Sequence, residues 1–248
     1  MPSHEFLRLC CYGCGKFINV PVYCGDRFCP VCMRPRLARL RKRLAFLVCE
    51  ASRSNATRFK HITFTLRNMR DLPAMVKKLV SSFRKVRQSK LWKTYVDGGA
   101  FVIEVTYNQE HSTWHAHIHA IVQCNWIPWE KLLQTWLHAS GGSRGVYIAK
   151  LPASQAVKYL TKYMTKPSVE PGQLPQVNQA LKGLRLFSPF GTWYAINRTY
   201  EPAKHPCSDC GRLGAYDLAY HADRGPMTEW LTVGKAGKPL VSCSGVSG

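Results

Sequence analysis

Residues 113–122, TWHAHIHAIV, place a histidine at every second position of an otherwise apolar run. In an extended strand, successive side chains point to opposite faces, so His115, His117 and His119 share one face of the predicted strand. Burying a row of imidazoles without partners is costly, whereas neutral imidazole is the commonest metal ligand in proteins. The pattern therefore predicts a strand whose polar face binds a metal or, alternatively, hydrogen-bonds into the core.

The preceding run AFVIEVTY (100–107) predicts a partner strand, joined through NQEHST as a β-hairpin. Its one acid, Glu104, stands among apolar residues, where a carboxylate needs a charged partner. Two imidazoles and one carboxylate on neighbouring strands leave coordination positions open and suit a divalent metal acting as a Lewis acid. We expect His117, His119 and Glu104 as ligands, with His115 as a further candidate.

The periodicity of apolar residues places the other elements around this hairpin. Alternating, β-rich runs predict strands at 60–68 and 146–151, and GLRLFSPFGTWYAIN (183–197) reads as a pair of strands. Helical spacing predicts helices at 34–48, 72–92, 127–140 and 154–166. This order indicates an α+β fold with a central antiparallel sheet and flanking helices.

The charge of the chain indicates a polyanionic partner. Thirty-five Lys and Arg residues against fourteen Asp and Glu give a formal net charge of +21 in 248 residues. Nucleic acid is the expected partner, although an anionic membrane surface attracts the same charge. No apolar run is long enough to span a bilayer, and the chain does not start with a signal-peptide pattern, so we expect a cytoplasmic protein without a membrane partner.

The cysteines indicate zinc rather than disulfides. Six of the eleven lie within residues 10–32, and several form Cys-x-x-Cys pairs. Fourteen residues separate two such pairs, which suits one tetrahedral Zn²⁺ with four thiolate ligands. The expected ligands are Cys11, Cys14, Cys29 and Cys32, with Cys10 and Cys24 competing for the same positions. A later pair, Cys207 and Cys210, is a possible second zinc site, assisted by His205, His221 or Cys243.

The helix predicted at 154–166 carries two tyrosines one turn apart. Tyr159 and Tyr163 lie on a wheel between an apolar stripe and a row formed by Lys158, Lys162 and Lys166. Tyrosines at the edge of a core stripe are common in proteins. Tyrosine is also a nucleophile, and adjacent ammonium groups or a metal would help its phenol to ionise.

These motifs resemble those of a known group of enzymes. His117-Ile-His119 resembles the His-hydrophobic-His motif of the HUH endonucleases, and the run YLTKYMTK resembles the two-tyrosine motif of rolling-circle replication initiators. HITFTLRN is similar to the first motif of that family. CGDRFCPVCMRPR and GLRLFSPFG are similar to the zinc-binding start of plasmid initiators and to a turn after their tyrosine motif. The similarity covers about residues 10–195.

The resemblance implies a ferredoxin-like HUH sheet with the histidine strand in its middle and the tyrosine helix packed near the metal. It implies catalytic Mg²⁺ or Mn²⁺ on the predicted ligands and Tyr159 and Tyr163 as nucleophiles, supported by Lys162 and Lys166. Tyr163 matches the Lys-Tyr pair of plasmid initiators and Tyr159 matches a Tyr-x-x-Lys pattern, so the order of the two nucleophiles stays open. The implied domains are a zinc module at 1–33, the endonuclease domain at 34–200 and an extension at 201–248.

The function implied is sequence-specific nicking and rejoining of DNA through a 5′-phosphotyrosine, which starts and ends rolling-circle replication of a plasmid or single-stranded DNA phage. The expected substrate is a single-stranded or hairpin origin. Because the chain has no Gly-x-x-x-x-Gly-Lys-Ser/Thr nucleotide loop, a host helicase is the expected unwinding partner. The alternatives are an HUH single-strand transposase and a non-enzymatic zinc-ribbon regulator that binds DNA.

Overall fold

The chain forms two compact units in a computed structural model. The first comprises Met1–Cys32 together with Pro202–Gly248, and the second comprises Met33–Glu201. The two chain ends, expected as a zinc module and a separate extension, thus share one unit. The structure describes residues 6–22, 24, 26–53, 58–124, 126–165, 169–185, 187–201, 206–212, 216–221 and 225–226.

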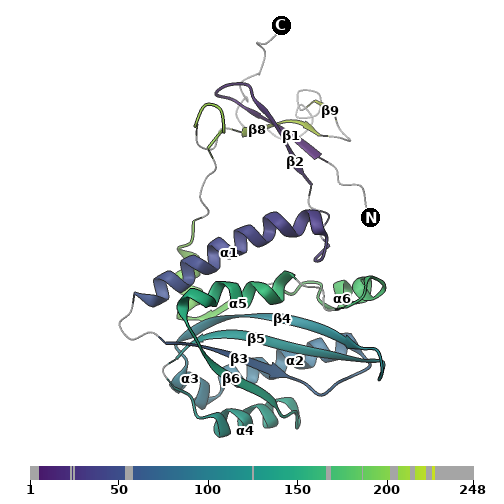
Figure 1. Cartoon of the computed structure of the whole chain (residues 1–248), viewed down its shortest axis with the longest axis vertical. Helices are drawn as coiled ribbons and strands as arrows, with labels where there is room; N and C mark the ends of the chain where they lie inside the picture. Colours follow the sequence, from purple (N-terminus) through teal and green to yellow (C-terminus); the bar gives the residue numbers. More distant parts are fainter. Residues whose placement is uncertain are drawn as a thin grey trace, which may run out of the picture. The chain divides into compact units, whose positions relative to one another are not determined.

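The larger unit is built on a five-stranded antiparallel sheet with strand order β6-β3-β5-β4-β7 (Figure 1). The expected α+β fold with flanking helices is therefore confirmed, and the histidine strand β5 occupies the middle of the sheet. The strands are β3 (Phe59–Thr65), β4 (Gly98–Asn108), β5 (Thr113–Gln123), β6 (Gly145–Leu151) and β7 (Ser188–Gly191).

One face of this sheet is covered by α2 (Leu72–Gln88), α3 (Lys90–Tyr95) and α4 (Trp129–Ser140). Rings join the layers, since Phe64 of β3 packs against Phe83 of α2 and Trp136 of α4 with centroids 5.3 and 5.0 Å apart. The single helix expected at 72–92 is two helices. Ser89 ends α2 and caps α3, because its hydroxyl accepts the Trp92 backbone N–H at 3.2 Å.

The opposite face packs against α1 (Pro30–Ser52), α5 (Ala153–Thr165) and α7 (Thr192–Arg198). Ala100 and Val102 of β4 and Ile121 of β5 share one buried apolar cluster with these helices. Further along the same strands, the residues on this face are polar: Glu104 on β4 and His119, His117 and His115 on β5. Apolar contacts thus hold the helices at one end of the face, and the polar row lies at the other.

Residues 183–197 differ from the strand pair expected there. β7 ends at Gly191, and α7 follows directly. Gly191 has a left-handed φ of 60°, and a Cβ on it would meet the Asp97 carbonyl oxygen at 2.3 Å. The turn sends Trp193 into the core, where its Nε1 donates to Gln123 Oε1 at 3.0 Å. Between α5 and β7 the chain forms a 3-10 turn, Pro171–Gln173, and the short helix α6, Leu174–Ala180.

The smaller unit contains a four-stranded sheet with order β2-β1-β8-β9. β1 pairs antiparallel with β2 in a hairpin and with β8 on its other side, so residues from the two ends of the chain are neighbours. None of the helices in the described part of the chain has the length and apolar content needed to cross a bilayer. The strands are β1 (Phe6–Cys11), β2 (Phe17–Pro21), β8 (Tyr216–His221) and β9 (Gly225–Pro226).

Candidate functional site

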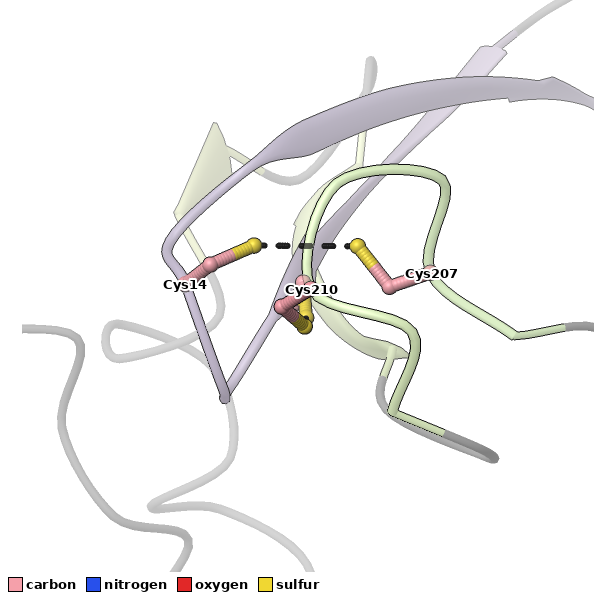
Figure 2. A group of neighbouring side chains, drawn as sticks. Cys14, Cys207 and Cys210 are labelled. Atoms are coloured by element: carbon pink, nitrogen blue, oxygen red, sulfur yellow. Dashed lines mark hydrogen bonds between the residues drawn. The ribbon is translucent and has the colours of Figure 1, made fainter.

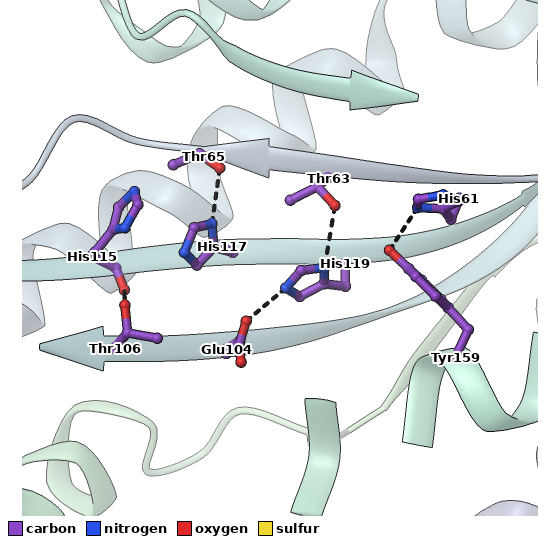
Figure 3. Close-up of polar contacts among 9 residues, drawn as sticks. All are labelled: His61, Thr63, Thr65, Glu104, Thr106, His115, His117, His119 and Tyr159. Atoms are coloured by element: carbon purple, nitrogen blue, oxygen red, sulfur yellow. Dashed lines mark hydrogen bonds and ion pairs between the residues drawn. The ribbon is translucent and has the colours of Figure 1, made fainter. Parts of the chain in front are cut away.

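Two threonines of β3 hold two histidines of β5. Strand pairing sets Thr65 opposite His117 and Thr63 opposite His119. The Thr65 Oγ1–His117 Nδ1 distance is 2.9 Å and the Thr63 Oγ1–His119 Nδ1 distance is 3.2 Å (Figure 3). Metal-binding histidines are ordinarily oriented in this way through their second ring nitrogen. The threonines therefore fix both rings and leave each Nε2 for another partner.

Glu104 supplies that partner for His119. His119 Nε2 lies 2.8 Å from Glu104 Oε2, and the two side chains are 8% and 16% exposed. The His117 and His119 ring centroids are 5.7 Å apart, so the structure brings the three predicted ligands to one face. Among the described residues, the groups of three or more ligand atoms that lie within 4.8 Å of one another are cysteine clusters. The His–Glu group is thus more open than those clusters, and its donor set of two imidazoles and a carboxylate suits a divalent ion.

Burial keeps two histidines of the row neutral. Burial, together with the neighbouring His115 and His119, lowers the pKa of His117 to about 4. Burial also lowers the pKa of His115, whose ring centroid lies 4.2 Å from that of His117. Neutral imidazole is the form that binds a metal. His115 and His117 are therefore in the form that binds a metal at neutral pH.

Acidification is expected to destabilise the metal-free protein through His117. A histidine in the unfolded chain protonates near pH 6.5, whereas His117 in the folded chain stays neutral down to about pH 4. The unfolded state binds the extra proton within this window, so the free energy of unfolding falls as the pH falls through it. Urea denaturation of EDTA-treated protein at neutral and acidic pH measures this loss. His117→Asn should lose less stability on acidification, and equal pH dependence in the two proteins would refute the assignment.

The tyrosines of α5 contact the same face. Ala156, Leu160 and Met164 are buried against the sheet and fix the rotation of the helix. The Tyr163 ring stacks on the His119 ring with centroids 3.5 Å apart and an interplanar angle of 8°. The Tyr159 and Tyr163 rings are 5.3 Å apart. Both predicted nucleophiles thus lie beside the predicted metal ligands.

Tyr159 has a partner that the sequence interpretation missed. Its hydroxyl lies 2.8 Å from Nδ1 of His61 on β3 (Figure 3). Burial lowers the pKa of His61 and raises the pKa of the Tyr159 phenol, so both groups are neutral at pH 7. Neutral His61 is able to accept the phenolic proton. The signal was present in the alternation of His61, Thr63 and Thr65, which puts all three on the face of the histidine row.

Of the two lysines predicted to support the tyrosines, the structure describes Lys162. Lys162 is exposed, and its Nζ lies 5.5 Å from the centroid of the Tyr163 ring, within the range of a cation–π contact. Lys166 lies outside the described residues.

A four-cysteine cluster joins the two ends of the chain. The Cys14 and Cys207 Sγ atoms are 3.6 Å apart (Figure 2). The Cys11 and Cys210 Sγ atoms are 3.7 Å apart. All four sulfurs lie within 4.8 Å of one another. This set fits a tetrahedral four-thiolate Zn²⁺ site.

The two halves of this cluster have the same local structure. In each Cys-x-x-Cys-Gly turn the first cysteine's N–H donates to the carbonyl five residues on, at 2.8 and 2.9 Å. In each turn the glycine is left-handed, with φ of 74° at Gly15 and 70° at Gly211. Such turns point both sulfurs of a pair to one side, as a shared metal requires. Lys16 and Asp209 add an ion pair at 2.5 Å between the turns.

The structure therefore does not bring together the four cysteines chosen from sequence spacing. Cys29 and Cys32 instead lie with Cys24 in a second cluster, in which the Cys24 and Cys32 sulfurs are 3.6 Å apart. The pairing of β1 with β8 brings the turn that contains Cys207 and Cys210 next to the turn that contains Cys11 and Cys14. Cys207 and Cys210 thus occupy the ligand positions that were predicted for Cys29 and Cys32. Cys10 Sγ faces the carbonyls of Cys11 and Gly15. The suggested helpers His205 and Cys243, and the side chain of His221, lie outside the described structure.

Comparisons with known proteins match part of the chain to replication proteins. A family model described as "Replication protein" matches residues 15–137. Three curated relatives, each called "Protein rep", come from a Bacillus species, Bacillus amyloliquefaciens and Streptococcus pneumoniae. They are 31% identical over 102 residues, 30% over 102 and 33% over 104. Each match covers 40% of this chain and 33%, 30% and 32% of the respective relative. No solved structure matches.

Residues 15–137, just under half of the chain, match the Replication protein family, and the resemblance to plasmid rolling-circle initiators is confirmed. The chain spans about a third of the length of the curated relatives it matches. The family match contains Glu104 and the histidine strand and ends before α5. The role expected for the two tyrosines therefore rests on their position beside the histidine row.

Proposed function

We propose that this protein is a metal-dependent DNA nickase and strand transferase that starts and ends rolling-circle replication. The observation that carries the proposal is the contact of α5 with the histidine row. Tyr163 stacks on His119, and Tyr159 stands beside both rings. Two nucleophiles and three ligands of a divalent ion on one face are what two successive phosphoryl transfers require. The net charge of +21 supports DNA as the substrate.

Glu104, His117 and His119 are the proposed ligands of Mg²⁺ or Mn²⁺. A divalent ion bound there would polarise the oxygens of a DNA phosphate and stabilise the charge that develops on them. Thr63 and Thr65 orient the two imidazoles through their Nδ1 atoms. His119 Nε2 and Glu104 Oε2 lie 2.8 Å apart, and these two atoms are among those that would bind the ion.

Tyr159 is the proposed first nucleophile, because its hydroxyl already has a neutral base as partner. Its oxygen forms a bond to the scissile phosphorus while the bond from phosphorus to the 3′ oxygen breaks. The phenolic proton passes to His61 Nδ1, and the 3′ oxygen takes a proton from solvent. The products are a 5′-phosphotyrosine and a free 3′-hydroxyl, which a polymerase extends.

Tyr163 is the proposed second nucleophile. While Tyr159 holds the first 5′ end, the oxygen of Tyr163 is able to attack the phosphorus of the regenerated junction, and the bond from that phosphorus to the 3′ oxygen breaks. The 3′-hydroxyl released then attacks the phosphotyrosine of Tyr159, which joins the strand and frees Tyr159. Termination then needs no activated water. The chain has no nucleotide-binding loop of its own, so we propose that a host helicase opens the duplex.

Replacing His61 by glutamine is expected to slow the first cleavage by about 100-fold, because a general base typically contributes 10²–10⁴-fold. Glutamine keeps a polar side chain at this position but cannot accept the proton. Single-turnover cleavage with excess protein measures the rate. His111→Gln, at an exposed histidine of the β4–β5 turn, is the matched control. A wild-type rate in His61→Gln would assign the proton to another acceptor.

The proposed function is tested with single-stranded oligonucleotides that carry hairpins, incubated with Mn²⁺ in the presence or absence of EDTA. We expect cleavage that EDTA prevents and that Glu104→Gln lowers by about 100-fold, since the loss of even an outer-shell partner of a metal ligand typically costs about 10–100-fold. Glu130→Gln, at an exposed acid of α4, should cleave normally. Binding without cleavage across hairpins of varied sequence would instead favour a regulator.

A further inference from the structure

An exposed tyrosine lies on the catalytic face without a role in the chemistry proposed above. β6 is the edge strand beside β3, and its pairing sets Gly145 opposite Thr65 and Tyr147 opposite Thr63. Alternate residues of a strand share a face, so Tyr147 projects on the same side as the histidine row. Its ring centroid lies 5.3 Å from that of His61, which holds Tyr159. Tyr147 thus stands at the edge of the reacting centre.

Tyr147 has only small neighbours on its own strand. The neighbours of Tyr147 on the same face of β6 are Gly145, which has no side chain, and Ala149, which has a single methyl group. A Cβ on Gly145 would meet the Thr65 Cβ at 2.5 Å, so the close approach of β3 excludes a larger residue there. Tyr147 is 59% exposed. Its ring therefore contacts His61 and still keeps more than half of its surface accessible.

The backbone under Tyr147 is held firmly. β6 pairs with β3 along its whole length, and Trp129 Nε1 donates to the Val146 carbonyl at 3.4 Å from the other face. His61 contacts one side of the Tyr147 ring at an interplanar angle of 50°. A fixed, exposed ring loses little conformational freedom when a second flat group stacks on it.

We propose that Tyr147 stacks on an unpaired nucleobase next to the scissile phosphate and so positions single-stranded DNA for attack by Tyr159. The inference rests on the proposed function for its substrate. Base–aromatic stacking tolerates any sequence, because every base has a π face. Stacking contacts the base and not the phosphate. Its contribution to affinity therefore adds to the electrostatic attraction between the basic protein and the DNA backbone. A duplex cannot use this ring, since its bases are already stacked.

The test compares two fluorescein-labelled probes of equal charge: a twelve-nucleotide oligothymidine and a twelve-unit strand of abasic deoxyribose phosphates. Binding is measured by fluorescence anisotropy in protein carrying Tyr159→Phe and Tyr163→Phe, so that no covalent link forms. Tyr147→Ala should weaken binding of oligothymidine by about 5- to 100-fold, the range for losing one stacked base. Binding of the abasic strand, and the dependence of affinity on salt, should not change because no cation is removed.

Two further variants make the result specific. Tyr147→Phe keeps the ring and should bind oligothymidine as the parent protein does. Tyr194→Ala is the control, because Tyr194 is 51% exposed on α7, which packs against β7 at the other end of the sheet order. Equal effects of Tyr147→Ala on both probes, or no effect on either, would overturn the inference. The unmutated tyrosines are tested separately for adducts, so failure of the nickase chemistry is distinguishable from failure of the stacking role.

Discussion

Tyr159→Phe is expected to reduce the first covalent joining of protein to DNA by about 10³-fold or more, as the loss of an essential nucleophile does in other enzymes. The substitution removes one oxygen and keeps the ring that packs between His61 and Tyr163. The fold and the metal ligands should therefore stay intact. Adduct formation on a denaturing gel gives the rate, and anisotropy shows whether DNA is still bound.

Tyr163→Phe gives the matched comparison on the same helix. Its ring would still stack on His119, and the Tyr159–His61 pair is untouched. We expect first cleavage near the wild-type rate and loss of the second strand transfer. If both single variants nick and rejoin DNA as the wild type does, the tyrosines are structural and the nuclease account fails. If Tyr163→Phe alone abolishes first cleavage, the order of the two nucleophiles is reversed.

Cys207→Ser is expected to release one equivalent of zinc and to unfold the smaller unit, although Cys207 lies almost 200 residues from its partners Cys11 and Cys14. Zinc binding in small structural sites is worth roughly 10–16 kcal/mol of folding free energy, so losing one of four thiolates is severe. Zinc content by elemental analysis and limited proteolysis measure the two effects. Cys49→Ser, at an exposed cysteine of α1 outside both clusters, is the control.

Cys29→Ser separates the observed grouping from the one expected from spacing. In the structure Cys29 belongs with Cys24 and Cys32, so its loss should leave the metal bound by Cys11, Cys14, Cys207 and Cys210 in place. If zinc instead bridged the first two Cys-x-x-Cys pairs, Cys29→Ser would release it and Cys207→Ser would not. The two variants therefore have opposite expected results under the two groupings.

The hairpin at the centre of the five-stranded sheet was predictable from sequence because its signals are local. The alternation of side-chain polarity in 100–107 and 114–122 predicts two strands. Because only a short turn connects them, the two strands pair with each other. That hairpin sets Glu104 directly opposite His117 and next to His119. The apolar stripe of 154–166 likewise fixed which side of the helix meets the sheet, so the tyrosines lie where the motif placed them.

What sequence reasoning missed depends on contacts between distant segments. The pairing of β1 with β8 decides the cysteine grouping, and no spacing within residues 10–32 encodes it. The roles of His61, Thr63 and Thr65 follow from the register of β3 against β5 and from the approach of α5. α7 replaces a strand because Gly191 turns the chain and Trp193 fills the core, and tertiary burial overrides the β-propensity of the run.

The most direct test of the proposed chemistry is mass spectrometry of the wild-type protein after incubation with Mn²⁺ and single-stranded hairpin DNA. We expect a peptide that carries a 5′-linked nucleotide on Tyr159, a free 3′-hydroxyl on the released strand, and neither product when EDTA is present. Cleaved DNA without any tyrosine-linked nucleotide, or an adduct that forms equally well in EDTA, would contradict this chemistry.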